Sequence, residues 1–217
     1  LMACLGYPDC PEHLERIVER DPWGGDGEVL ASAPAFPECA WPKDLRLIEI
    51  AVAERAAGLK TLVYFTQVDK RSPIPRVRRL LEGAGLKVVV LDGSVDPDKR
   101  EEWLIKAVAD GFDVMLTNGR LVETGLDLIF ATHIVQYGLE YSIPSLRQST
   151  RRSWRLGQTR PVRVTYLAYR KTMQEIGMAL TARKMRSAEL VDGDDLGGLA
   201  QHDEGGSDFL IELAREA

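Results

Sequence analysis

Two kinds of apolar pattern alternate along the middle of the chain. A short continuous apolar run, of the type found in buried parallel strands, covers 61–66, and further strands are predicted over 87–91, 113–117, 131–137 and 162–168. Apolar residues at helical spacing predict helices over 42–58, 77–82, 97–109, 144–155 and 172–190. The 42–58 helix presents an apolar face made of Leu45, Ile48, Ala51, Val52 and Ala56. Strands that alternate with helices predict an α/β fold, with a three-layer parallel sheet covered by helices on both faces.

The two ends of the chain lack this alternation. Six prolines from Pro8 to Pro42 predict an irregular arm over 1–42, which leaves room for a helix only over 12–20. After Leu190, eight carboxylates face a single arginine among several glycines, so we expect an acidic, partly flexible tail over 191–217. The α/β lobe is therefore predicted to span 43–190.

Composition narrows the class of protein. The chain is 45% apolar and 28% charged, as in ordinary globular proteins, and no apolar run approaches the roughly 18 residues of a membrane span. Its first ten residues lack a secretory signal, and three cysteines cannot all pair, so we expect a reducing, cytoplasmic setting without a membrane partner. Zinc-binding residue types occur at Cys4, Cys10, His13 and Cys39, but only Cys10 and His13 are closely spaced, which favours free thiols.

Charge is unevenly distributed, although the net charge is only -5. No carboxylate lies between Tyr141 and Gln174, a window with eight basic residues whose densest part is QSTRRSWRLGQ, residues 148–158. On the predicted 144–155 helix, Arg152 and Arg155 would be neighbours on one face. A pair of planar guanidinium groups matches the oxygens of a transferring phosphoryl group. The alternative interpretation is a solvated basic helix.

A second polar segment, TNGRLVETGLDL at 117–128, follows a predicted strand. Gly125 lets the backbone approach a ligand closely, Asp127 offers a carboxylate suited to ribose hydroxyls, and Thr117 and Asn118 suit a nucleic-acid phosphate. The alternative is a strand followed by a capped turn. The chain has no G-x-x-x-x-G-K-[ST] phosphate loop and no acidic D-E pair after a strand, which argues against an autonomous nucleotide hydrolase.

These two segments resemble motifs of the superfamily-2 helicases, particularly the Swi/Snf type and related bacterial DNA translocases. The conserved positions of the family's last motif correspond here to Gln148, Arg152, Arg155, Gly157 and Gln158, whereas Arg151 and Trp154 depart from it. The 117–128 segment resembles the family's T…G-L-D motif. Two weaker resemblances lie in LVYFTQ at 62–67 and LDGSVDPDKREEW at 91–103, so the likeness covers roughly Lys60 to Tyr169.

The resemblance implies the second RecA-like lobe of an ATP-dependent DNA helicase or translocase, cut from a longer polypeptide. ATP and Mg²⁺ would be held mainly by the N-terminal lobe of that polypeptide, with Arg152 at the terminal phosphates and Arg155 as the arginine finger. The implied ATP-binding set is Gly125, Asp127, Gln148, Arg152 and Arg155. The implied contacts to the DNA backbone, independent of base sequence, are Thr66, Gln67, Lys70, Arg71, Gly93, Ser94, Thr117 and Asn118. For Lys70 and Arg71, a solvated loop is the alternative.

Two other functions are compatible with the predicted fold. A non-catalytic module would use the same sheet and basic helix only to bind nucleic acid. An α/β enzyme of another class, such as a sugar-nucleotide transferase, would share the parallel sheet by convergence, which fold alone does not exclude. The arginine-rich segment that ends in Gly157 and Gln158 has no evident use in such a transferase.

Overall fold

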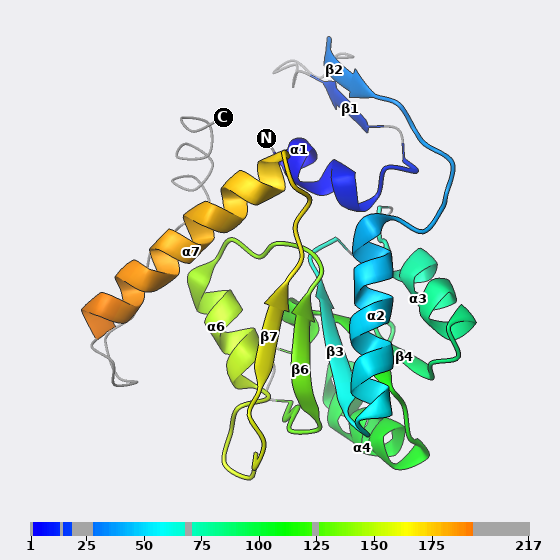
Figure 1. The fold of residues 1–217 in the computed structure, drawn as a ribbon, viewed down its shortest axis with the longest axis vertical. Helices are drawn as coiled ribbons and strands as arrows, with labels where there is room; N and C mark the ends of the chain where they lie inside the picture. Colours follow the sequence, from blue (N-terminus) through cyan, green and yellow to red (C-terminus); the bar gives the residue numbers. More distant parts are fainter. Residues whose placement is uncertain (1, 14, 19–27, 68–70, 123–125, 193–217) are drawn as a thin grey trace.

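A five-stranded parallel sheet forms the centre of the molecule (Figure 1). The computed structural model describes residues 2–13, 15–18, 28–67, 71–122 and 126–192. In the order β4-β5-β3-β6-β7, the strands are β4 (Val88–Leu91), β5 (Val114–Asn118), β3 (Lys60–Phe65), β6 (Ala131–Gln136) and β7 (Arg163–Tyr166). The predicted α/β fold is confirmed, and the strand boundaries differ from the predicted ones by at most two residues.

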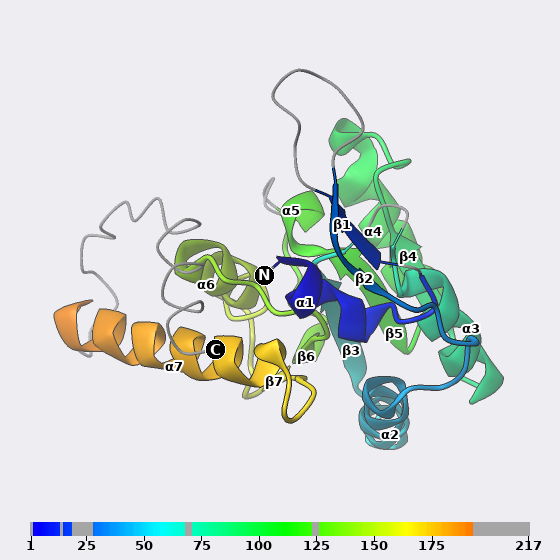
Figure 2. The same ribbon diagram turned by 90° about the horizontal axis from the view of Figure 1, so that it is seen from above.

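Helices cover both faces of the sheet (Figure 2). Packing of buried side chains places α2 (Pro42–Ala56) and α3 (Ile74–Gly83) on one face. The other face carries α4 (Arg100–Asp110), preceded by the 3-10 turn η2 (Pro97–Lys99), together with α5 (Gly119–Val122) and α6 (Ile143–Arg151). Helix α7 (Met173–Asp192) packs against α6 and the N-terminal helix α1 (Met2–Gly6).

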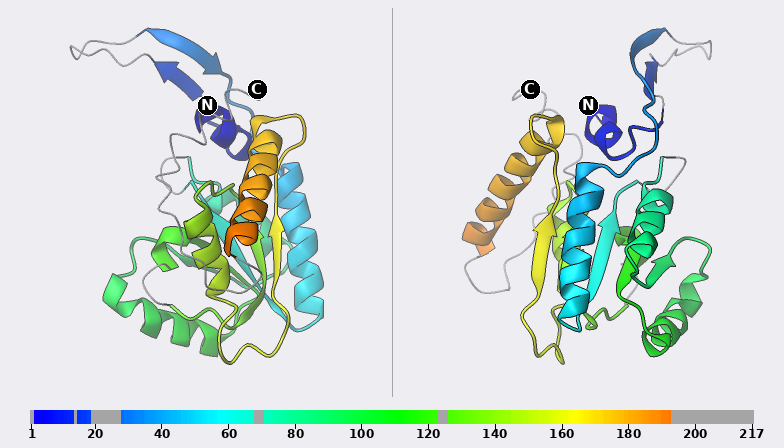
Figure 3. Two further views of the ribbon diagram at one scale, coloured as in Figure 1. Left: turned by 90° about the vertical axis from the view of Figure 1, so that its left-hand side faces the viewer. Right: turned by 45° about the vertical axis from the view of Figure 1, so that its right-hand side comes forward.

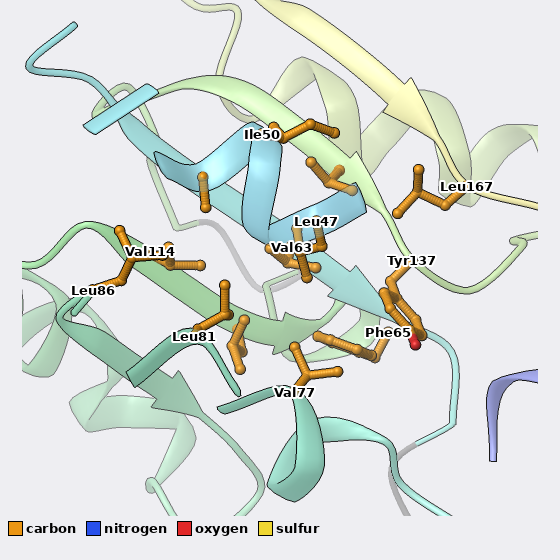
Figure 4. Packing of buried hydrophobic residues seen from close by; sticks show 13 residues of the cluster. Leu47, Ile50, Val63, Phe65, Val77, Leu81, Leu86, Val114, Tyr137 and Leu167 are labelled. Carbon is orange, nitrogen blue, oxygen red and sulfur yellow. The ribbon is translucent and has the colours of Figure 1, made fainter. Parts of the chain in front are cut away.

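The larger core cluster lies between the sheet and α2 and α3 (Figure 4). Leu47 from α2 and Leu81 from α3 are fully buried against Val63 and Phe65 of β3. Burying each such side chain contributes about 1.5–3 kcal/mol relative to leaving it in water. The central strand β3 is thus apolar on both faces, which explains why its sequence is a continuous apolar run.

The buried face of α2 differs from the predicted one. Leu45 and Val52 are 51% and 44% exposed, so their assignment to an apolar packing face is wrong. The helix buries Lys43 and Asp44 together with Leu47. Two charged residues become buried because their partners lie in distant parts of the chain, which the helical spacing of apolar residues does not reveal.

A buried polar network fixes the N-terminal segment to the lobe. Lys43 Nζ lies 2.7 Å from Asp9 Oδ1 and donates to the Tyr137 carbonyl at 2.9 Å. Asp44 accepts from Arg76 Nε at 3.1 Å and from the Tyr137 hydroxyl at 2.7 Å. Each buried charge therefore has a charged partner and further hydrogen bonds, the condition under which buried ion pairs are tolerated.

The predicted arm contains regular structure within the described residues. After α1 come the 3-10 turn η1 (Tyr7–Asp9) and an antiparallel pair, β1 (Glu15–Val18) and β2 (Val29–Ala33), which projects from the body of the lobe (Figure 3). The prediction of a helix over 12–20 is wrong because residues 15–18 find a pairing strand in residues 29–33. The tail beyond 192 lies outside the described residues.

Neither a membrane helix nor a metal cluster is found in the described part of the chain. No helix there is long and apolar enough to cross a bilayer. The same residues contain no group of three or more His, Cys, Asp or Glu side chains arranged to hold a metal ion. Cys4 and Cys39 are exposed, whereas Cys10 is buried.

Candidate functional site

The arginine-rich segment begins on α6 but continues past its end. The helix stops at Arg151, and Arg152 occupies its C-cap. Residues 153–158 form turns, in which Trp154 N donates to the Arg151 carbonyl at 3.2 Å and Gln158 N to the Arg155 carbonyl at 2.9 Å. The prediction that Arg152 and Arg155 share one helical face is therefore wrong, because Arg155 lies in the turn that follows the helix.

These turns are held against the residues that precede β6. Leu128 N donates to the Arg152 carbonyl at 3.1 Å, and Gln158 Nε2 donates to the Ile129 carbonyl at 2.9 Å. Gly157 has a φ of 101°, a left-handed conformation that favours glycine, so the chain turns here without strain. The two polar segments found in the sequence are thus joined in space by one backbone hydrogen bond, and a side-chain hydrogen bond from Gln158 adds to it.

The side chains at this junction differ in exposure. Arg155 Nη1 forms an ion pair with Asp127 Oδ1, with side chains 44% and 58% exposed. Arg152 is buried and lies close enough to Tyr64 for its charge to oppose the rise that burial causes in the pKa of that phenol. Gln148 is exposed on α6, and Gly125 lies outside the described residues. Of Arg152 and Arg155, Arg155 is accordingly the more accessible to a ligand from solvent.

A second group of predicted residues follows neighbouring strands. Thr66 and Gln67 follow β3, Gly93 and Ser94 follow β4, and Asn118 ends β5, so all meet at the carboxyl edge of the sheet. At β4, Ser94 donates from its backbone nitrogen and hydroxyl to Asp92, and these bonds lower the pKa of the Asp92 carboxyl. The sheet order brings these loops together as sequence reasoning expected.

Thr117 differs from its neighbours at this edge. It is fully buried in β5, and its hydroxyl donates to the Leu91 carbonyl of β4 at 3.0 Å. The hydroxyl is used inside the sheet, whereas Asn118, which is 7% exposed, lines a pocket at the edge. Lys70 lies outside the described residues.

The N-terminal segment contacts the loop after β3. Arg71 Nη1 lies 2.7 Å from Glu15 Oε2, and the Cys10 thiol donates to the Arg71 carbonyl and, at 3.4 Å, to Gln67 Oε1. Burial raises the pKa of Cys10 to about 12, which keeps the thiol protonated as a donor at neutral pH. The arm is therefore part of this edge, a role that its proline content did not indicate.

A pocket of about 200 Å³ opens at the same edge. Its lining includes Tyr64 and Gln67 around β3, Asn118 at β5, Gln136 at the end of β6, and Leu5 of α1. Gln136 was missed by the sequence reasoning, although it carries the same signal as Asn118, a carboxamide at the carboxyl end of a buried strand. The pocket adjoins the predicted nucleic-acid residues, which follow strands. The Arg155–Asp127 pair is separate from it in the chain order, because Asp127 precedes β6 and Arg155 precedes β7.

Known proteins share sequence and fold with this chain. A profile of the helicase conserved C-terminal domain matches residues 42–157. The chain is 30% identical over 151 residues to the helicase-like transcription factor CHR28 of Arabidopsis thaliana, covering 70% of this chain and 14% of that protein. It is 32% identical over 160 residues to the "SWI/SNF-related matrix-associated actin-dependent regulator of chromatin subfamily A containing DEAD/H box 1 homolog" of Caenorhabditis elegans, covering 73% of this chain and 15% of that protein.

A solved structure shows the same fold. The crystal structure of the C-terminal part of the Fun30 ATPase domain superposes with a TM-score of 0.59 at 18% identity, covering 92% of this chain and 56% of that one. The chain spans only 14–15% of the length of the two curated relatives. The likeness therefore concerns one lobe of much longer proteins.

Proposed function

Since the chain belongs to the helicase conserved C-terminal domain family of superfamily-2 ATP-dependent helicases and translocases, we propose a specific role for it. It is the second RecA-like lobe of a Swi/Snf-like DNA translocase or helicase. The observation that carries the proposal is the junction of the two polar segments. The backbone of 152–158 is fixed against 128–129 while the Arg155 side chain stays half exposed beside Asp127. Such an arrangement presents a guanidinium to a ligand brought by another lobe.

We assign the nucleotide side of the lobe to Asp127, Gln148, Arg152 and Arg155, with Gly125 proposed from sequence alone. ATP and Mg²⁺ would be held mainly by the N-terminal lobe of the same polypeptide. The residues present fit a phosphoryl group, because Arg155 is already paired with a carboxylate and guanidinium groups bind carboxylate and phosphate oxygens with similar geometry. Mg²⁺ would supply charge neutralisation at the phosphates, and Arg155 would add a second positive charge there.

The second arginine has a different part in this proposal. Arg152 caps α6 from a buried position, and its carbonyl accepts from Leu128 N. We assign it to the terminal phosphates together with the positioning of the turn that carries Arg155. Asp127 holds the Arg155 side chain in place when no phosphate is near.

The carboxyl edge of the sheet is the proposed DNA-binding side. Thr66, Gln67, Asn118, Gly93 and Ser94 offer hydroxyl, carboxamide and backbone groups, which suit sequence-independent contacts to a phosphate backbone. Arg71 adds positive charge, with Lys70 proposed from the sequence alone. Alternating closure of the two lobes around ATP would then move this edge along the strand.

The test is DNA-stimulated ATP hydrolysis by the complete polypeptide that carries this chain. Replacing an arginine finger lowers turnover by about a thousandfold or more, so Arg155→Ala should abolish most of the stimulated rate. Arg160→Ala is the matched control, because Arg160 is exposed just beyond the same segment. Near-normal turnover in Arg155→Ala would refute the assigned role, and DNA binding without any ATP hydrolysis would favour the non-catalytic binding module.

A further inference from the structure

The pocket at the carboxyl edge contains a polar group without a partner. Gln136 is 3% exposed, and its Nε2 makes no hydrogen bond within the described part of the chain. A buried donor left unpaired costs about 1–3 kcal/mol, so native proteins retain such groups where something else uses them. Because Gln136 lines the pocket, a rotation of its carboxamide would bring this buried donor to an acceptor bound there.

The charges of the pocket do not favour an anion. Arg120 is balanced by Asp9 and Glu140 among the lining residues. Asp9 is paired with Lys43, and Glu140 Oε1 accepts from Ser142 N at 3.0 Å. No excess positive charge in the described lining would attract a phosphate, so the expected occupant is neutral and polar.

The size and donors of the pocket match a flat heterocycle. A cavity of about 150 Å³ accommodates benzene, so about 200 Å³ accommodates one base ring with its exocyclic groups. The pocket is lined by the carboxamides of Gln136 and Asn118 and by the partly exposed Tyr141, while Tyr64 is buried in the core. Carboxamides recognise base edges, and aromatic rings stack on base faces.

We propose that this pocket binds one unpaired nucleobase of a nucleic-acid strand, with Gln136 Nε2 donating to an acceptor on the base. The inference rests on the proposed function, because the strand backbone would run outside the pocket, past the neighbouring loop that carries Gly93 and Ser94, while one base enters it. It goes beyond a grip on the backbone alone, since part of the affinity would come from a base. The lobe would then hold single-stranded nucleic acid, or a base displaced from a duplex, more tightly than an intact duplex.

The experiment compares two oligonucleotides with the complete polypeptide. One is oligothymidylate of about 20 nucleotides, and the other has the same backbone with abasic sites throughout. One stacked and hydrogen-bonded base contributes about 1–3 kcal/mol, so we expect the abasic strand to bind about tenfold more weakly. Gln136→Leu should reduce oligothymidylate binding severalfold and leave binding of the abasic strand unchanged.

Stability measurements separate this role from a structural one. Gln136→Leu removes an unpaired buried donor, so the midpoint of urea unfolding should stay the same or rise. Gln136→Met is the second variant, because it keeps the length of the side chain without its donor and adds no charge, and it should show the same loss of base-dependent binding. Equal loss of affinity for both oligonucleotides in either folded variant would overturn the proposal.

The outcomes also distinguish this inference from the proposed function. If both oligonucleotides bind equally well to the unaltered protein and both stimulate ATP hydrolysis, the base pocket is refuted and the motor function stands. If oligothymidylate binds about tenfold better than the abasic strand and no ATP hydrolysis occurs, the base pocket stands and the motor function fails. If neither oligonucleotide binds, the base pocket is overturned, and the motor function is judged by ATP hydrolysis stimulated with duplex DNA.

Discussion

Replacing Lys43 by methionine should destabilise the lobe strongly, because it leaves the Asp9 carboxylate buried without its cation. The two side chains are 3% and 5% exposed, and their charged atoms lie 2.7 Å apart. Breaking a buried pair on one side costs about 3–5 kcal/mol, a large part of the roughly 5–15 kcal/mol that stabilises a domain. Lys43 also donates to the Tyr137 carbonyl, so the loss of that bond adds to the cost.

The measurement is urea unfolding followed by tryptophan fluorescence. Trp41 is a suitable reporter because its backbone nitrogen donates to Asp44 Oδ2 within the same network. The matched variant is Asp9→Leu combined with Lys43→Met, which removes both charges and should recover more than half of the loss. A loss below about 1 kcal/mol in Lys43→Met, or a double variant no more stable than the single one, would refute the reasoning.

The pH dependence of this variant has a definite sign. Burial raises the pKa of Asp9, and attraction to Lys43 opposes that rise. Without Lys43 the pKa rises further, so the folded variant takes up a proton more readily than the unfolded chain. Its stability relative to the unaltered protein should therefore improve as the pH falls from about 7.5 to about 5.5. A deficit that grows over this range would contradict the assignment.

Two further substitutions test packing and the exposed ion pair. A Cβ at position 138 would lie 2.2 Å from Thr66 Oγ1 and 2.9 Å from its backbone nitrogen, so Gly138→Ala should cost about 1–3 kcal/mol in urea unfolding. In Gly83→Ala nothing lies within 4 Å of the new Cβ, and this control should be neutral or more stable by up to about 1 kcal/mol. Arg155→Ala should change stability by less than about 1 kcal/mol, because the pair with Asp127 is solvent-screened; a larger loss by thermal unfolding would mean that its effect on turnover is partly structural.

The centre of the sheet could be predicted closely because β3, β5 and β6 are buried on both faces. In a run such as TLVYF every residue is apolar or buried, so there is no choice of which face of the strand packs against the core. The flanking turns limit the length of the strand. The helix at 42–56 was located correctly, but its buried face was not. The burial of Lys43 depends on Asp9, 34 residues earlier, and nothing in a local window indicates that these two residues meet.

The candidate site was predicted in part for a similar reason. Residues that follow strands were found because the carboxyl ends of parallel strands share one edge. The end of α6 at Arg151 was missed because the residues that follow it are as rich in arginine as the helix itself. The chain nevertheless turns there, and Gln158 donates a hydrogen bond to the Ile129 carbonyl. Gln136 was missed because it ends a strand that also contains Thr132 and His133, so a polar residue there does not stand out in the sequence.

The different environments of the two arginines change what the sequence motif implies. Sequence reasoning treats Arg152 and Arg155 as a pair that acts together, whereas the structure buries one and exposes the other. The guanidinium of Arg152 lies buried near the phenol of Tyr64, and the half-exposed one of Arg155 pairs with a solvent-screened carboxylate. A phosphoryl group arriving from another lobe needs to displace only Asp127 to reach Arg155. The weak ion pair therefore orients the Arg155 side chain, and breaking it costs little free energy when a phosphate binds. A residue that acts on an incoming phosphate requires both properties.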